Sequence, residues 1–210
     1  MSQLEEQDEF YRERIPEQFN RTLCAQRARA DGDAAATRVL EEMEAVRTSI
    51  VVEVDTGDTF RRHAFEINRG EMGYVEEASS APFMILGHSL EDFGNLRREC
   101  GDSLLGFLGA IAGLGDEMRL TSRRVRSLVE LAGSLVLERV GPGGFALFAH
   151  FGVEAPSPEP RARIRIDEAT YAQLRAGVLD PQDAFLKGRV EVLGDEAMAI
   201  ELALAALSPE

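Results

Sequence analysis

Residues 163–207 carry a succession of short strand and helix patterns that only a few small folds can accommodate. Ile164 and Ile166 alternate with arginines, which predicts a strand that is buried on one face. Two short helices are predicted to follow this strand. Asp167 supplies the N-terminal cap of the first helix. The second starts with Pro181 at its first position, where the missing N–H leaves no hydrogen bond unmade.

The same stretch ends with a second strand and a capped helix. Residues 189–193 alternate again, Gly194 turns the chain, and Asp195 caps a final helix. The apolar stripe of that helix consists of Ala197, Ile200, Leu204 and Leu207. The predicted order of elements is therefore strand, helix, helix, strand, helix.

This order of elements resembles the sterol-carrier-protein (SCP-2-like) domain family. The residues that carry the resemblance are Leu174, Gly177, Asp180, Pro181, Ala184, Phe185, Gly188, Gly194 and Asp195. They occupy cap, turn and core positions, so the resemblance bears on the fold far more than on chemistry. It implies a tunnel for sterols, fatty acyl chains or other lipids, and it implies binding or transfer rather than catalysis.

An earlier stretch, residues 86–128, repeats the final one with a single inserted residue. Before the insertion, Leu96 pairs with Leu174, and similar pairs are Arg97 with Arg175, Asp102 with Asp180, Phe107 with Phe185 and Leu108 with Leu186. Beyond the insertion, residues 114–117 pair with residues 193–196. Because caps and turns stay in phase, these identities indicate an internal duplication.

The strands and helices upstream complete the predicted units. A helix capped by Asp33 is expected to reach Arg47, and a second helix, capped by Asp116, is expected to end at Gly133. Period-2 patterns predict strands at Ser49–Asp55, His63–Asn68, Met72–Glu77, Phe83–Leu86, Ser134–Val140 and Phe145–Val153. Short connections between the first three strands favour an antiparallel meander.

The sequence thus predicts an α+β protein in which an antiparallel sheet is covered on one face by helices. Residues 1–32 are predicted to form an acidic helical arm and linker. Residues 33–133 form a first SCP-2-like unit, and residues 134–207 form a second, abbreviated one. In the arm, Tyr11, Ile15 and Phe19 lie on one helical face, which Pro16 interrupts. This face is expected to dock on the body of the protein or on another subunit; a flexible charged tail is the alternative.

Charge and composition exclude several classes of partner. A net charge of −14 argues against nucleic acids, because binding to phosphates needs a basic surface, and against steady contact with anionic membranes. No apolar run approaches the roughly 20 residues of a membrane span, and the first residues do not resemble a signal peptide, so a cytoplasmic location is expected. The two cysteines, Cys24 and Cys100, are expected to be free thiols.

No residue pattern predicts a catalytic centre, a metal site or a cofactor. The three histidines lack the spacing of zinc ligands, and the glycine-rich segments lack the lysine and hydroxyl residue of a phosphate-binding loop. His150 shares a strand face with Phe148. It could therefore be a polar anchor inside an apolar pocket or an ordinary histidine with satisfied hydrogen bonds.

The residues expected to line an apolar cavity between sheet and helices are aromatic, aliphatic or methionine side chains. They are Phe83, Phe93, Phe107, Leu108, Ile111, Phe145, Phe148, Phe151, Phe185 and Met198. The favoured function is binding of a hydrophobic small molecule such as a fatty acyl, sterol or polyketide-like compound. The alternatives are a cyclase or isomerase that uses His88, His150 or Cys100, and a ligand-free interaction module. A homodimer is left open.

Overall fold

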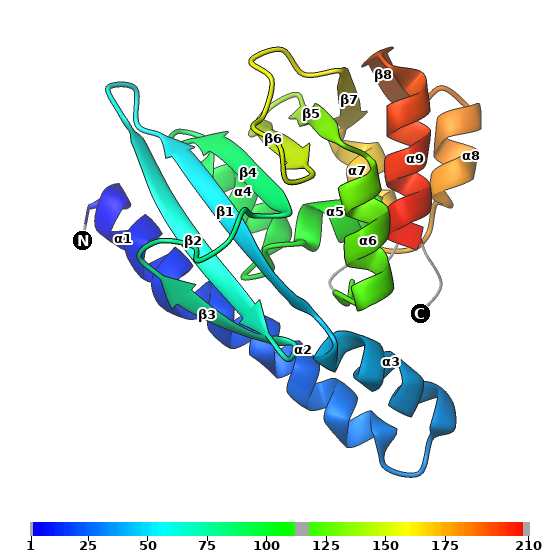
Figure 1. Cartoon of the computed structure of the whole chain (residues 1–210). Helices are drawn as coiled ribbons and strands as arrows, with labels where there is room; N and C mark the ends of the chain where they lie inside the picture. Colours follow the sequence, from blue (N-terminus) through cyan, green and yellow to red (C-terminus); the bar gives the residue numbers. More distant parts are fainter. Residues whose placement is uncertain (1, 112–117, 208–210) are drawn as a thin grey trace.

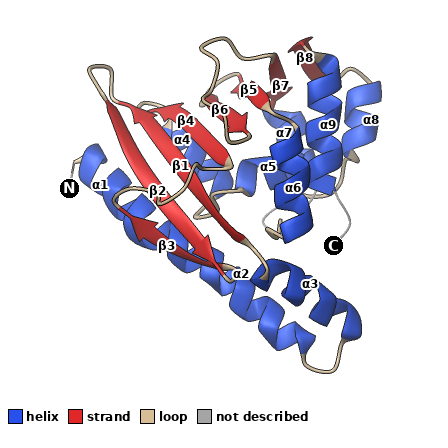
Figure 2. Ribbon diagram, in the orientation of Figure 1, coloured by secondary structure: helices blue, strands red, loops and turns tan. Residues whose placement is uncertain are grey.

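The structure, a computed structural model, describes residues 2–111 and 118–207, and in this part of the chain eight strands form one sheet. The strands are β1 Arg47–Asp55, β2 Phe60–Asn68, β3 Glu71–Val75, β4 Met84–Ser89, β5 Gly133–Val140, β6 Phe145–Phe151, β7 Ala162–Asp167 and β8 Val190–Gly194. Their order across the sheet is β3-β2-β1-β4-β6-β5-β7-β8 (Figure 2).

Helices precede the first strand and follow β4, β7 and β8 (Figure 1). Those of the first half are α1 Gln3–Glu9, the π-helix η1 Phe10–Arg14, α2 Ile15–Ala30, α3 Ala34–Glu44, α4 Phe93–Cys100, α5 Gly106–Ile111 and α6 Ser122–Glu130. Those of the second half are α7 Glu168–Arg175, α8 Pro181–Leu186 and α9 Glu196–Leu207. The predicted α+β class is confirmed.

The sheet contains the same strand arrangement twice. In the first half, β2 is antiparallel to β1, and β4 lies parallel to β1 on its other side. In the second half, β6 is antiparallel to β5, and β7 lies parallel to β5 on its other side. Each half then continues with helices. This recurrence supports the predicted duplication in part: β3 has no counterpart in the second half, and residues 112–117 of the predicted repeat lie outside the described residues.

One hydrophobic core extends beneath the whole sheet. It joins Ile50 and Phe65 of the first half to Leu135, Phe151 and Ile164 of the second, all of them at most 4% exposed. Figure 1 shows η1 and α2 lying across the back of β1–β3, on this core side. Helices therefore cover one face of the sheet, as predicted. The sheet is mixed, however, and not antiparallel as expected, because β1 with β4 and β5 with β7 pair in parallel.

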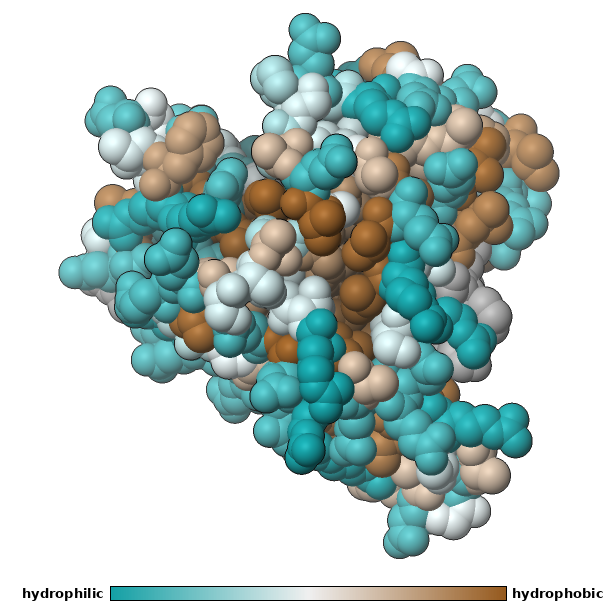
Figure 3. Space-filling view, in the orientation of Figure 1, coloured by the Kyte–Doolittle hydropathy of each residue, from teal (hydrophilic) through white to brown (hydrophobic). Residues whose placement is uncertain are grey.

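The opposite face of the sheet carries charged side chains and a small apolar cluster. Arg165 of β7 forms ion pairs with Glu138 of β5 at 3.2 Å and with Glu191 of β8 at 2.7 Å. The cluster consists of Val51, Ala64 and Ile85. Figure 3 shows hydrophobic side chains collected in a band between β4 and α6, and again over α8 at the upper right.

Two sequence predictions about helices need correction. The helix expected to start at Asp116 begins at Ser122 in the described part of the chain; Asp116 itself lies outside the described residues. Thr121 is the N-cap, and its hydroxyl accepts a hydrogen bond from the Arg124 amide at 3.2 Å. A hydroxyl directly before the helix satisfies an exposed amide and so fixes the start there.

Pro16 does not break the N-terminal helix, contrary to the prediction that it interrupts it. The Ile15 amide donates to the Phe10 carbonyl, five residues back, so the turn before Pro16 is a π turn. Pro16 then lies in the first turn of α2, where a missing N–H is tolerated. The π turn brings Phe10 and Tyr11 under the sheet together with Ile15, and all three are at most 5% exposed.

Candidate functional site

An apolar groove of about 320 Å³ lies between the last two strands and the last three helices. The strands contribute Ile164, Val190 and Val192. Helix α7 contributes Leu174, and α8 contributes Pro181, Gln182, Phe185 and Leu186. Helix α9 contributes Ala199, Ile200, Ala203 and Leu204. This volume is within the range of about 300–1,000 Å³ that small-molecule sites occupy.

The groove has a buried floor and an exposed apolar rim. Leu174 and Ile164 on the floor are almost fully buried, whereas Leu186 on α8 is 80% exposed and Leu204 on α9 is 60% exposed. Exposed apolar side chains that lie together mark a surface suited to binding, because their burial is favourable. Gln182 is the one polar side chain in the described lining. The groove therefore presents an apolar surface that an apolar molecule could cover.

Small side chains on α9 create the space. Ala199 and Ala203 are one helical turn apart and face the groove, so α9 presents little volume where it passes β8. Leucines at these two positions would fill the gap between helix and sheet. The free volume thus arises from the alanine-rich sequence of the final helix.

Carboxylate caps fix the helices that border the groove. Asp180 accepts from the backbone amides of Gln182 and Asp183 at 2.8 and 3.2 Å, and Asp195 accepts from the Met198 amide at 3.1 Å. The same type of amide hydrogen bond holds the pKa of Asp195 below its usual value. These aspartates were predicted as caps, and the prediction is confirmed.

Few of the side chains expected to line a cavity lie at the groove. Phe185 lines it, and Met198 is fully buried on α9 outside the groove lining. The shared core contains Phe83, Phe93, Leu108, Phe145 and Phe151, and Phe93 also lines a small cavity under the first half of the sheet. Phe148 is half-buried on the opposite face of the sheet, next to Gly87. The side chains of Phe107 and Ile111 lie outside the described part of the structure.

His150 has hydrogen-bond partners at both ring nitrogens. Nδ1 lies 2.9 Å from the Ser134 hydroxyl, and Nε2 lies 2.8 Å from the Glu154 carbonyl. Because a carbonyl can only accept, Nε2 donates to it and Nδ1 accepts from the serine. These contacts fix the local chain, and the described groove does not include this residue.

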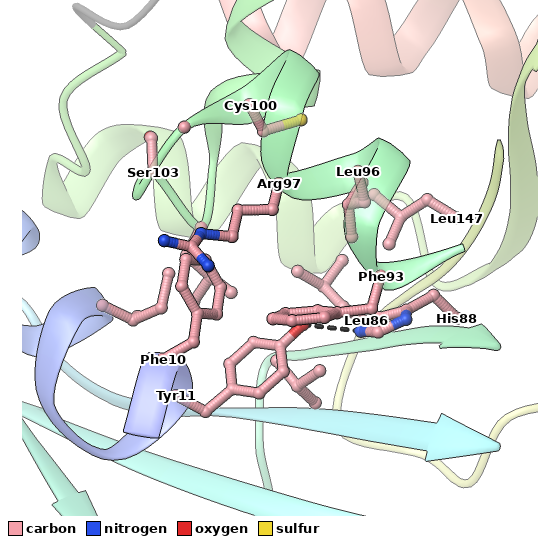
Figure 4. A pocket seen from close by; sticks show the side chains of 14 residues that line it. Phe10, Tyr11, Leu86, His88, Phe93, Leu96, Arg97, Cys100, Ser103 and Leu147 are labelled. Atoms are coloured by element: carbon pink, nitrogen blue, oxygen red, sulfur yellow. Dashed lines mark hydrogen bonds between the residues drawn. The ribbon is translucent and has the colours of Figure 1, made fainter. Parts of the chain in front are cut away.

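A second, much smaller cavity lies under the first half of the sheet (Figure 4). Its volume is about 30 Å³, roughly that of one water molecule. Phe10 and Tyr11 enter it from η1, His88 from β4, and Arg97 and Cys100 from α4. The N-terminal helix therefore fills most of the space between these elements.

A buried tyrosine–histidine pair closes this cavity. The Tyr11 hydroxyl lies 2.6 Å from His88 Nε2, and His88 Nδ1 lies 2.7 Å from the Ser89 carbonyl (Figure 4). Since the carbonyl accepts from Nδ1, Nε2 accepts from the tyrosine. Burial raises the pKa of Tyr11 and lowers the pKa of His88, so both groups stay neutral near pH 7.

His63 makes the fold sensitive to acid. Its Nε2 lies 3.1 Å from the Gln7 amide nitrogen, and burial lowers its pKa from 6.5 to about 4, although Asp8 opposes the shift. The folded state therefore binds fewer protons than the unfolded state between these values. The stability that the neutral His63 side chain contributes to the folded state is complete above pH 6.5 and is lost as the pH falls toward 4.

We expect this histidine alone to remove about 3 kcal/mol from the free energy of unfolding between pH 7 and pH 4. Urea denaturation of the wild type and of His63→Gln at both pH values checks the prediction, because the variant lacks the titrating group. If the free energy of unfolding falls equally in both proteins, His63 does not contribute to the acid sensitivity.

Other reactive groups form no metal or disulfide site in the described residues. Neither cysteine forms a disulfide: Cys24 is exposed, and Cys100 is buried with its sulfur 3.9 Å from the Tyr171 hydroxyl. Residues 2–111 and 118–207 contain no cluster of histidine, cysteine and acidic side chains suited to a metal. None of the described helices has the length and apolar character that crossing a membrane requires.

Comparison with known families matches about a third of the chain, the part that contains the groove. Residues 133–206 match the family model described as the SCP-2 sterol transfer family. The match confirms the family resemblance over β5–α9 and leaves the first half of the chain outside it. A search of curated proteins found no match.

Solved structures of sterol carrier proteins are also similar to this chain. Sterol carrier protein 2 from Yarrowia lipolytica, in its apo form, is 18% identical and covers 50% of this chain and 95% of its own, with a TM-score of 0.31. Sterol carrier protein 2 like 2 from Aedes aegypti is 21% identical. The match covers 35% of this chain and 72% of that protein, with a TM-score of 0.28. Superpositions this weak support no conclusion about function. The functional proposal depends instead on the family match and on the groove.

Proposed function

We propose that this chain, whose residues 133–206 match the SCP-2 sterol transfer family, binds and transfers a hydrophobic small molecule in the groove between α8, α9 and the sheet edge. The observation that carries the proposal is the groove itself: it is open, apolar throughout except for Gln182, and bordered by exposed leucines. Fatty acyl, sterol and polyketide-like molecules all offer the apolar surface that this lining would cover.

The lining indicates how a ligand would be oriented. No charged side chain lines the described groove, so the apolar body of the ligand would lie inside and its polar group would remain at the mouth. Lys187, the one lysine of the chain, follows Leu186 on the rim and is paired with Asp183 at 2.9 Å. Each methylene buried in the groove would contribute about 0.8 kcal/mol, offset by the cost of association.

The groove favours binding over catalysis. A cyclase or isomerase acting there would need a titratable group against the ligand, and the described lining contains none. Two of the residues that such an enzyme was expected to use, His88 and Cys100, line the small cavity under the first half instead. We therefore place the binding function in the groove and assign it no reaction.

Two measurements test the proposal. We expect native mass spectrometry and solvent extraction of the purified protein to show a co-purified lipid. We also expect a fluorescent fatty acid or a fluorescent sterol to bind with micromolar affinity and to be displaced by an unlabelled competitor. No extracted lipid together with no uptake of either probe would exclude the proposed function.

A further inference from the structure

The small cavity under the first half of the sheet occupies the position that the groove occupies in the second half. Leu86 on β4 lines the cavity, and Ile164 on β7 lines the groove. Each strand has an antiparallel neighbour on the same side: Leu86 pairs with Ala149 of β6, and Ile164 pairs with Val192 of β8. The floors of the two sites are therefore built alike.

The helices extend this correspondence. Leu96 of α4 lines the cavity where Leu174 of α7 lines the groove. Ser103 lines the cavity, and Pro181 lines the groove. Pro181 follows Ser103 in the chain by the same number of residues as Leu174 follows Leu96. One strand, the helix that follows it and the segment after that helix thus contribute equivalent residues to both sites.

The two sites differ in what fills them. The groove is open to solvent, whereas the cavity is filled by Phe10, Tyr11 and Ile15, each at most 5% exposed. Figure 4 shows Phe10 and Tyr11 directed into the space between α4 and β4. The N-terminal arm, defined here as residues 3–15, lies where a ligand would lie in the second half.

The N-terminal arm also places a carboxylate beside these apolar rings. Glu6 forms an ion pair with the Arg97 guanidinium, and the same guanidinium lies over the Phe10 ring at 5.6 Å. Arg97 is about a quarter exposed, so a charge at this position is reachable from solvent. An acid group on Arg97 with an apolar body behind it is the pattern of a long-chain carboxylate.

We infer that the first half of the chain contains a second ligand site, specific for a long-chain carboxylate, which the N-terminal arm occupies as a built-in competitor. The ligand's carboxylate would replace Glu6 on Arg97, and its chain would replace Phe10 and Tyr11. This inference takes only the hydrophobic nature of the ligand from the proposed function, because the second site differs in its charged partner.

The contacts that hold the arm set the affinity of the site. Gln7 hydrogen-bonds His63 at 3.1 Å, Tyr11 bonds His88 at 2.6 Å, and the Gln3 side chain donates to the Leu90 carbonyl at 2.8 Å. A ligand can enter only when these are broken, so its apparent affinity falls by the fraction of molecules in which the arm is released. Weakening the arm should therefore strengthen binding.

Binding of 11-(dansylamino)undecanoic acid and of its methyl ester tests the inference in a background that carries Ala203→Trp, which fills the groove. In this background we expect Phe10→Ala with Tyr11→Ala to raise the affinity for the acid at least tenfold. Arg97→Gln should reverse the gain, and the ester should gain much less than the acid. No gain, or an equal gain for the ester and for the Arg97→Gln variant, would overturn the inference.

Hydrogen exchange on the unmodified chain supplies a test that does not depend on the variants folding. Excess dodecanoic acid, kept below its micelle concentration, should speed amide exchange in residues 3–15 several-fold. Unchanged exchange in the arm would contradict the inference. Protection of α9 without a change in the arm would support the proposed function alone.

Discussion

The Ala203→Trp variant should bind hydrophobic ligands at least tenfold more weakly than the wild type. Ala203 faces the groove between α8, α9 and β8, and an indole at this position would take up much of its volume of about 320 Å³. The ligand would then lose most of the apolar contact that drives binding, at about 25 cal/mol per Å² of lost burial. Titration with a fluorescent fatty acid measures the change.

Ala197→Trp is the matched control for this variant. Ala197 lies on the same helix but is exposed and does not line the groove. The Ala197→Trp variant adds the same aromatic ring to the surface and should leave the affinity for the ligand unchanged. If both tryptophan variants bind like the wild type, the ligand does not occupy the groove. If both lose binding equally, the effect belongs to the helix and not to the cavity.

Gly194→Ala should lower the free energy of unfolding by about 3 kcal/mol, as measured by urea denaturation. Gly194 has φ +91° at the end of β8, and an added Cβ would lie 2.5 Å from the Arg161 carbonyl oxygen. That oxygen also accepts the Asp195 amide at 2.9 Å, so relief of the clash would break a backbone hydrogen bond. Because β8 lines the groove, ligand binding should fall as well.

Gly177→Ala separates the effect of backbone conformation from the effect of the clash. Gly177 also has positive φ, +64°, but an added Cβ would meet no atom within 4 Å. This variant should therefore cost only about 1 kcal/mol, the penalty for a side chain in the left-handed region. Equal losses at the two glycines would show that the close approach at Arg161 does not matter.

Local signals in the sequence predicted much of the fold correctly. The caps at Asp167, Asp180 and Asp195 are observed, because an aspartate satisfies the first amides of a helix whatever surrounds it. The strands were placed within a few residues, since alternation of burial is set by the pleat of the strand itself.

The site was less predictable, because a cavity forms where large side chains are absent. Of the aromatic residues expected to line a cavity, Phe185 lies at the groove, whereas Phe83, Phe145 and Phe151 lie in the core, as bulky groups do in a close-packed interior. The groove depends instead on Ala199 and Ala203, which are unremarkable in a helical sequence. Only the packing of α9 against β8 shows that these alanines face an open space.

The sequence predicted the helical arm but not its path under the sheet, for a different reason. Pro16 suggested a break, whereas a π turn at Phe10–Arg14 lets the helix continue and rotates Phe10 and Tyr11 toward the sheet. That turn is stabilised by tertiary contacts, including the hydrogen bond between Tyr11 and His88. Such contacts join residues far apart in the chain, and no local pattern records them.

Photo-crosslinking tests the central claim, that the groove is the ligand site, most directly. The wild-type protein would be irradiated with a fatty acid that carries a diazirine at the end of its chain, then digested and mapped by mass spectrometry. The account predicts that the main label falls within residues 181–204, where α8, β8 and α9 border the groove, and that Ala203→Trp removes it. A label confined to other segments, unchanged by that substitution, would contradict the account.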